Sequence, residues 1–167
     1  MLLALAMLIF ALTAYAESRK QVNTTTVTNF DLPKYMGRWY EIARLENGFQ
    51  RGMTDVIAEY TLLDDGRVRI INSGMRNGER HQSIGKGKTT AQAGRLRVSF
   101  FMSFYSDYNI MEMASDGQWV LVGSSSPKYL WILARSRELP ADVINHIVEL
   151  ARLRGYDTDA LIFNEVQ

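Results

Sequence analysis

The chain has 167 residues, of which 47% are hydrophobic, and this is enough for one domain with a buried core. Nineteen basic and eighteen acidic side chains leave a formal charge of +1, so no broad positive field is present to attract nucleic acid. The absence of cysteine excludes disulfides, thiol catalysis, zinc–thiolate sites and attachment to lipid through a thiol.

The start of the chain is uncharged and apolar. Residues 1–16 are rich in leucine and end in the small-x-small sequence Ala14-Tyr15-Ala16. They are fewer than the about 20 apolar residues that a membrane-spanning helix needs, so they predict a cleaved signal peptide, with a retained anchor as the alternative. Residues 17–28 are polar and rich in threonine, which predicts a flexible leader.

Residues 29–167 are predicted to form a single all-β domain. After a short helical turn that Asp31 caps and Pro33 begins, the alternation of apolar and polar residues predicts eight strands. Their ranges are 38–45, 54–63, 67–75, 80–89, 95–102, 108–114, 118–124 and 128–135. The tight turns at 64–66 and 77–78, and the other short connections, predict an up-and-down antiparallel meander. Such a meander buries its inner face by closing into a barrel.

The end of the chain has a different period. Apolar residues recur at helical spacing from Val143 to Ala151, with Pro140 before them and Gly155 after them. This predicts one amphipathic helix packed outside the sheet, and residues 160–166 are expected to add a short strand at an edge.

The first strand sets the expected inner face of the barrel. Alternation sends Trp39, Glu41 and Ala43 to one face and Tyr40, Ile42 and Arg44 to the other. If Trp39 points inward, parity places aromatic and apolar residues of the other strands inside with it, and Gly85 and Gly87 leave volume between them. A buried Glu41 needs a partner, for which we expect an arginine near the floor. An interior filled solidly by these side chains is the alternative to an open cavity.

Three segments resemble a known family. Residues 29–31, residues 35–44 with Gly37-Arg38-Trp39, and residues 129–135 are similar to lipocalins, in particular to bacterial outer-membrane lipocalins and apolipoprotein D. The resemblance extends over residues 29–163. It implies an eight-stranded barrel that holds a small hydrophobic molecule. It also implies that Arg135 lies across Trp39 beside Gly37 as a structural floor, and that Tyr60 and Trp131 line the cavity.

The chain departs from this family at two places. The Thr-Asp-Tyr motif between the sixth and seventh strands is replaced by residues 113–116, so the closed end is expected to differ there. The lipid-modified cysteine of several bacterial relatives is absent. We therefore expect an unanchored protein exported to the periplasm or outside the cell, with outer-membrane association as a further expectation.

The predicted function is the binding and the storage or transport of a fatty acid, a lysophospholipid or a similar lipid. Burying each methylene contributes about 0.8 kcal/mol, so an acyl chain binds with little polar chemistry. Asn72, Tyr60 and Tyr108 are expected to select the head group near the mouth, and Phe49 to act as a lid. The full set of predicted ligand contacts is Phe49, Ala58, Tyr60, Val68, Ile70, Asn72, Val98, Phe100, Tyr108, Ile110, Val122, Tyr129 and Trp131.

Two other function classes remain open. An enzyme acting on a hydrophobic substrate would use Glu41 or Glu112 as a base. Placing Tyr108 and Ile110 inward carries Glu112 inward as well, where its charge needs a partner. A filled barrel acting as an interaction module is the other class, and a homodimer is compatible with it. No cofactor or metal site is expected, because the two histidines, His81 and His146, are too few for a metal site.

Overall fold

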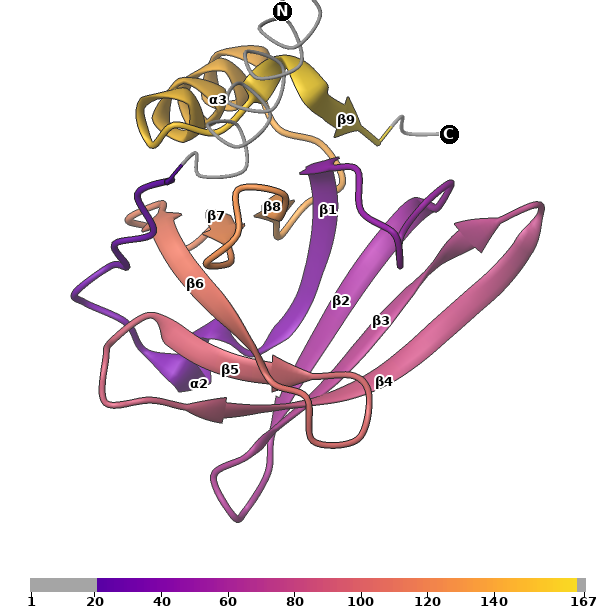
Figure 1. Ribbon diagram of the computed structural model, residues 1–167, viewed down its shortest axis with the longest axis vertical. Helices are drawn as coiled ribbons and strands as arrows, with labels where there is room; N and C mark the ends of the chain where they lie inside the picture. The colour runs from indigo at the N-terminus through magenta and orange to yellow at the C-terminus, as the bar shows by residue number, and fades with distance from the viewer. Residues whose placement is uncertain (1–20, 165–167) are drawn as a thin grey trace, which may run out of the picture.

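The computed structural model describes residues 21–164, which form one antiparallel sheet and two α-helices (Figure 1). The strands follow the order β2-β3-β4-β5-β6-β7-β8-β1-β9, and pairing of β2 with β1 closes the barrel. The predicted eight-stranded barrel with one C-terminal helix and a short added strand is thereby confirmed. The predicted signal peptide lies outside the described residues.

The strand bounds are β1 Gly37–Leu45, β2 Thr54–Leu62, β3 Val68–Arg76, β4 Glu79–Thr89, β5 Arg95–Ser99, β6 Ser106–Met113, β7 Trp119–Gly123, β8 Leu130–Ala134 and β9 Leu161–Phe163.

The fifth strand is shorter than predicted. It ends at Ser99 instead of continuing to Met102, because the Ser99 hydroxyl donates to the carbonyl oxygens of Phe101 and Met102 and stabilises a turn there. Met102 has a left-handed backbone with φ of 50°, which is incompatible with a continuing strand.

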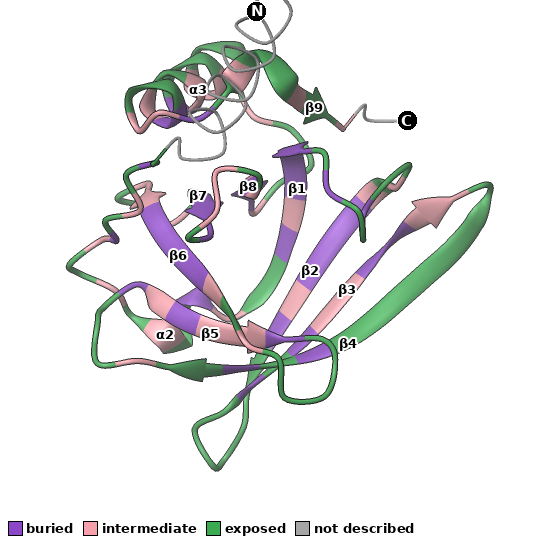
Figure 2. Ribbon diagram, in the orientation of Figure 1, coloured by how far each residue is buried: buried purple, intermediate pink, exposed green. Residues whose placement is uncertain are grey.

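Helix α3 (Ala141–Leu153) lies outside the barrel, against the face formed by β6, β7, β8 and β1 (Figure 1). Its Ile147 and Ala151 are fully buried in a cluster with Leu121 and Ile132 of the sheet. On the opposite side, the β3–β4 hairpin projects away from the rest of the barrel, and residues 79–84 of β4 are exposed on both faces (Figure 2). The barrel is therefore covered on one side and flared on the other.

Bulges interrupt the alternation of the two strands that flank the helix-covered face. In β1, Glu41 pairs with Leu133 and Ala43 with Ile132, so Ile42 is an extra residue. In β6 a bulge lies between Ile110 and Glu112. Each bulge presents two successive residues to the helix side, and each reverses the parity of the residues that follow.

The first bulge corrects the predicted face of β1. Ala43 packs outside the barrel with the helix cluster, whereas Arg44 faces inward beside Trp131. The second bulge resolves the direction of Glu112. Met111 and Glu112 both point outward, so Tyr108 and Ile110 face the lumen without taking a carboxylate with them.

Strand β1 changes partners along its length. It pairs with β2 from Gly37 to Tyr40, and from Ala43 to Leu45 it pairs with β9 instead. Beyond Tyr40, no backbone pairing joins β1 to β2 within the described part of the chain.

Residues 21–28 belong to the segment that the sequence predicted as a flexible leader, but they are held against the barrel. Val22 is buried in the helix cluster, and the Val27 amide donates to the Ile110 carbonyl oxygen at 3.0 Å. Arg154 donates to the carbonyl oxygens of Asn23 and Thr25, each at 3.0 Å. Satisfied backbone groups and a buried valine give this stretch a fixed path.

Candidate functional site

One end of the barrel is plugged by an arginine and a tryptophan. The Arg135 guanidinium carbon lies 3.7 Å from the centre of the Trp39 ring, and Trp39 is 1% exposed. Arg135 also donates to the carbonyl oxygens of Arg38, Lys34 and Tyr35, at 2.8 to 3.1 Å. Helix α2 (Leu32–Tyr35) is thereby tied to β1 across this end, and we call it the closed end.

Gly37 precedes this plug and has a φ of 92°, a left-handed conformation that side chains rarely adopt. Arg135 approaches it closely, since a methyl group added there would lie 3.5 Å from Nη1. The glycine therefore permits the turn from α2 into β1 that brings Trp39 under the arginine.

Much of the interior is filled by side chains, from Val68 near the closed end to Val122, which pairs with Trp131. Val68, Ile70, Ile110 and Val122, all predicted as ligand contacts, are exposed by 1% or less and belong to one buried cluster. No room for a water molecule lies beside them. This part of the barrel matches the solid core that the sequence left as an alternative.

Toward the other end the inward-facing side chains become progressively exposed. In β3, Val68 is 0% exposed, whereas Asn72, nearer the open end, is half-buried. In β5, Leu96 is 1% exposed and Val98 is half-buried, and Phe100, directly after the strand, is 42% exposed. Because the strands alternate in direction, the loops at 46–53, 77–78, 100–105 and 124–129 surround this end. We call it the open end, and the barrel is accessible from there.

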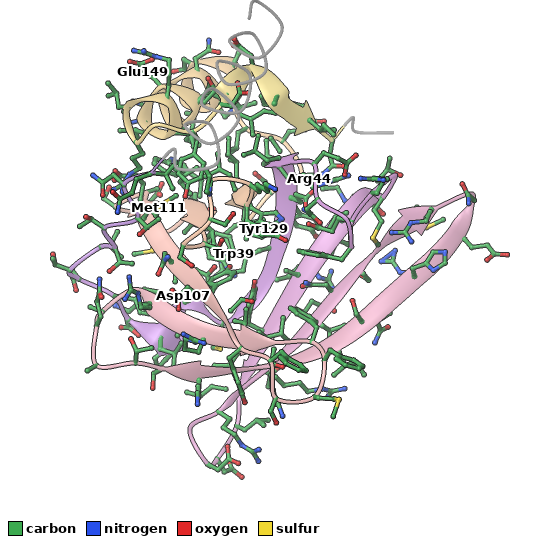
Figure 3. The ribbon with its side chains drawn as sticks, in the orientation of Figure 1. Trp39, Arg44, Asp107, Met111, Tyr129 and Glu149 are labelled. Carbon is green, nitrogen blue, oxygen red and sulfur yellow. The ribbon has the colours of Figure 1, made fainter. Side chains whose placement is uncertain are left out.

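Aromatic rings gather at the open end. Phe49 of the β1–β2 loop stacks on Tyr129, with ring centres 5.9 Å apart and planes at 17°, and Tyr129 stacks on Trp131 at 6.0 Å. Phe49 is 59% exposed, while Tyr129 and Trp131 are half-buried. In Figure 3 the label of Tyr129 lies between those of Arg44 and Trp39. Three predicted ligand contacts are thus brought together at the mouth.

The glycine at 85 was predicted to leave volume in the lumen, but an aromatic ring fills that volume. An added methyl group would lie only 2.6 Å from the Phe100 ring. Gly85 is therefore required by the close approach of Phe100, and the space that remains lies above this ring.

The sequence did not predict the polar network that holds the β1–β2 loop over the open end. Glu41 accepts from Arg44 Nη1 at 2.6 Å, from Gln50 Nε2 at 2.8 Å and from Asn164 Nδ2 at 2.9 Å. Both side chains of the Glu41–Arg44 ion pair are 2% exposed. The arginine that neutralises Glu41 therefore comes from the same strand, through the bulge, and not from the floor.

The same network fixes the loop and one predicted contact residue. Arg44 Nη2 donates to the carbonyl oxygens of Gln50 and Met53, at 3.1 and 3.0 Å. Gln50 Oε1 accepts from Asn47 Nδ2 at 2.9 Å and from Trp131 Nε1 at 2.8 Å. The one signal in the sequence was the need of an inward Glu41 for partners. Nothing in the alternation pointed to Gln50 or Asn47.

Three tyrosine hydroxyls meet inside the barrel, and we call them the tyrosine triad. Tyr108 Oη lies 2.6 Å from Tyr35 Oη and 2.9 Å from Tyr60 Oη. The three side chains come from α2, β2 and β6, so the chain of hydroxyls crosses the lumen. Tyr60 and Tyr108, expected near the mouth, are instead buried toward the closed end, with exposed fractions of 5% and 9%. Tyr60 pairs with Gly37, and the ring centre of Tyr35 lies 5.1 Å from that of Trp39.

Burial controls the protonation of the triad. It raises the pKa of Tyr60 to about 12, and it raises the pKa values of Tyr35 and Tyr108 well above their usual value. All three phenols are therefore neutral near pH 7 and act as hydrogen-bond donors and acceptors.

The carboxylates considered for catalysis are engaged in ion pairs. Glu41 has the three donors described above, and Glu112 accepts from Arg154 Nη2 at 2.8 Å on the outer face. Within residues 21–164 no group of three histidine, aspartate or glutamate side chains is placed to hold a metal ion. The same residues contain no helix long and apolar enough to cross a membrane.

The β6–β7 turn, where the Thr-Asp-Tyr motif is replaced, is bordered by two surface hollows. One of about 380 Å³ is lined by Lys34, Met113, Asp116 and Arg135, and one of about 470 Å³ lies between the turn and the start of α3. Both are outside the barrel. The altered turn thus shapes the outer surface of the closed end and not the lumen.

A barrel plugged at one end and accessible at the other defines a cup-shaped antiparallel β-barrel protein. The pattern of the lipocalin-like domain matches residues 30–166, and the chain belongs to the lipocalin family. It is 36% identical over 166 residues to the outer membrane lipoprotein Blc of Escherichia coli strain K12, covering 97% of this chain and 94% of the relative. It is 27% identical over 184 residues to apolipoprotein D of Cavia porcellus, covering 99% and 95%. The predicted relationship to these two groups is confirmed.

Solved structures agree on the fold. Insecticyanin from the tobacco hornworm Manduca sexta superimposes with a TM-score of 0.68 at 21% identity, over 89% of this chain and 84% of that one. Members of the lipocalin family bind small hydrophobic molecules.

The relatives contradict the predicted localisation. The sequence predicted an unanchored protein in the periplasm or outside the cell, whereas the bacterial relatives at 34–36% identity are outer membrane lipoproteins by name. This chain differs from them in having no cysteine for a lipid anchor.

Proposed function

We propose that the protein binds a small hydrophobic molecule, a lipid with an acyl chain, in the accessible part of the barrel. The observation that supports this most directly is the increase in exposure of the inward-facing side chains from the closed end to the aromatic open end. Ala58, Val98, Phe100 and Trp131 then contact the chain, while Val68 and Ile70 stabilise the fold below it.

The open end favours a ligand with an anionic head group, such as a fatty acid or a lysophospholipid. Arg51 and Lys128 are exposed in two of the loops that surround it. Arg76, whose Nη2 donates to the Phe49 carbonyl oxygen at 3.1 Å, has an Nε without a partner. A cation near a carboxylate or phosphate adds to affinity, and each buried methylene contributes about 0.8 kcal/mol.

Displacement of a fluorescent fatty acid from the purified protein tests this proposal. Saturable binding, and displacement by hexadecanoic acid and by a lysophospholipid, are expected. An organic extract of the protein is expected to contain lipid by mass spectrometry. No saturable binding together with an empty extract would exclude the lipid-binding function.

Binding, and not catalysis, is what the interior supports, because Glu41 already accepts hydrogen bonds from three side chains. An enzyme would need a base that is free to take a proton. Glu41→Gln is therefore expected to lower stability, with no turnover to abolish.

We also propose that the β5–β6 loop contacts a lipid surface when ligand enters or leaves. Phe101, Met102 and Phe104 are each about 70% exposed, and the rings of Phe101 and Phe104 stack at 6.4 Å. Beside them, Lys88 Nζ lies 4.5 Å from the centre of the Tyr105 ring. Exposed apolar side chains next to lysines suit the interface of an anionic bilayer.

Co-sedimentation with vesicles of phosphatidylcholine and phosphatidylglycerol tests the loop. Phe101→Ser with Phe104→Ser is expected to reduce the bound fraction several-fold, whereas Leu153→Ser, an exposed apolar residue of α3, is the control. If the loop variant binds vesicles as the wild type does but loses a dimer on size exclusion, the loop is a contact between two copies.

A further inference from the structure

The tyrosine triad has one more hydrogen-bond donor than it uses. Its three hydroxyl groups carry three protons, and the two contacts at 2.6 and 2.9 Å use two of them. Within residues 21–164 no other acceptor lies at hydrogen-bond distance from these oxygens. One O–H of the buried triad is therefore left to donate to another group.

An acceptor without a partner lies on the neighbouring strand. Asn72 is half-buried, and its Oδ1 is buried and makes no hydrogen bond. Asn72 pairs with Ala58 and Ile70 pairs with Tyr60, so Asn72 and Tyr60 are diagonal neighbours on the inner face. Residues in that relation lie about 7–8 Å apart, within reach of a long aromatic side chain.

A spare donor beside a spare acceptor matches one chemical group. A hydroxyl accepts from the first and donates to the second, whereas a methyl group satisfies neither and a carboxylate would repel Asn72 Oδ1. The surroundings are otherwise apolar and aromatic, because the triad belongs to one buried cluster with Trp39, Val68 and Ile70. A charged group there would be desolvated without a counter-ion.

We propose that the barrel recognises a neutral hydroxyl at the buried end of its lipid ligand, which accepts a hydrogen bond from the tyrosine triad and donates one to Asn72. This site rests on the proposed lipid-binding function and specifies its ligand class, an apolar chain or ring system that carries a hydroxyl at the end that enters first. The anionic or polar head group remains at the open end.

Pairs of ligands of equal length test the hydroxyl site. Saturated fatty acids of eight to sixteen carbons are compared with the corresponding ω-hydroxy acids by displacement of a fluorescent fatty acid. A purely apolar pocket rejects an added hydroxyl by about 100-fold. The wild type is instead expected to bind the ω-hydroxy acid as tightly as the plain acid, or up to about tenfold more tightly, at the chain length that reaches the triad.

Two independent variants remove the two halves of the site. Tyr35→Phe/Tyr60→Phe/Tyr108→Phe deletes every hydroxyl of the triad and so leaves none of them buried without a partner, and Asn72→Leu removes the acceptor. Each is expected to lower the preference for the ω-hydroxy acid by tenfold or more while plain acids still bind. The control is Tyr40→Phe with Asn145→Leu, which deletes the same groups outside the lumen.

The outcomes separate the two proposals. If neither acid of any pair binds, the lipid-binding function fails and the hydroxyl site with it. If plain acids bind and the wild type rejects the ω-hydroxy acids by about 100-fold, the lipid-binding function stands and the hydroxyl site is wrong. The site is also wrong if Asn72→Leu, or the triple variant when it folds, keeps the wild-type preference.

Discussion

The two ends of the barrel use the same strands in opposite ways. At the closed end the inward side chains are fully buried, and Arg135 covers Trp39 at 3.7 Å. At the open end the inward Trp131 is half-buried, and Phe49 of the overlying loop is mostly exposed. The same alternation of side chains thus gives tight packing at one end and an accessible aromatic surface at the other. The residues that stabilise the fold therefore lie at a different end of the barrel from those expected to bind ligand.

The largest expected effect is at the closed end. Trp39→Ala removes a buried ring and the cation–π contact with Arg135, and we expect the free energy of unfolding to fall by about 3–5 kcal/mol. Urea denaturation at pH 7 measures this. The fraction that remains folded is expected to bind fluorescent fatty acid nearly as the wild type does. A tenfold loss of affinity without loss of stability would reverse the roles assigned to the two ends.

The second largest effect is expected at the buried Glu41–Arg44 ion pair, which holds the β1–β2 loop. Arg44→Met leaves Glu41 buried without its 2.6 Å partner, and we expect a loss of about 3 kcal/mol in the free energy of unfolding. Glu41→Gln combined with Arg44→Met is expected to recover part of that loss, because no unpaired charge remains. A double variant as unstable as the sum of the single variants would show that the pair is not coupled.

The tyrosine triad makes the free energy of unfolding depend on pH. An unfolded phenol has a pKa of about 10, and burial raises that of Tyr60 to about 12. The raised pKa stabilises the fold fully below pH 10 or so, and this contribution disappears as the pH rises from about 10 to about 12. At about 1.4 kcal/mol per pKa unit, the shift of about two units at Tyr60 contributes on the order of 3 kcal/mol.

Urea denaturation at several pH values between 9 and 12 measures this dependence. The triple phenylalanine variant of the triad is expected to lose less stability over that interval than the wild type. Equal losses would assign the alkaline sensitivity to other groups.

The smallest expected effect is at the open end. Trp131→Ala removes an aromatic wall of the accessible part, and we expect affinity for fluorescent fatty acid to fall about tenfold, with a loss of stability near 1 kcal/mol. Trp119→Ala is the matched control, because Trp119 packs on the outer face, where its ring centre lies 6.2 Å from that of His146. Equal loss of affinity in both variants would contradict a site at the open end.

Much of the fold could be predicted from the sequence, because strand alternation, hairpin turns and helical spacing are local signals. The positions of Trp39, Arg135 and the α3 helix followed from them and from the lipocalin resemblance. The face of Arg44 and Glu112 could not be predicted, because a single bulged residue, Ile42 or Met111, reverses the parity of every residue after it. No local signal in either strand distinguishes a bulge from continued pairing.

The candidate site shows a second limit of the same kind. Parity places Val68 and Asn72 on one face of β3. Whether such a residue is buried or accessible depends on how tightly the side chains around it are packed, and alternation does not show this. Gly85 likewise gave no sign that the Phe100 ring would cover it. Side chains that meet across the lumen, such as those of the tyrosine triad, come from strands that are distant in the sequence.

The change of partners in β1 makes the wall of the barrel mechanically uneven. Between β1 and β2 above Tyr40, cohesion comes from the guanidinium of Arg44 bonded to the Gln50 and Met53 carbonyl oxygens and not from a backbone ladder. Separating β1 from β2 along this unpaired stretch, which we call the seam, breaks a few side-chain hydrogen bonds and leaves the backbone pairing of every strand intact. Amide hydrogen exchange is therefore expected to be faster in residues 46–56 than in β7 and β8. We therefore expect the barrel to widen along this seam when it takes up a broad ligand.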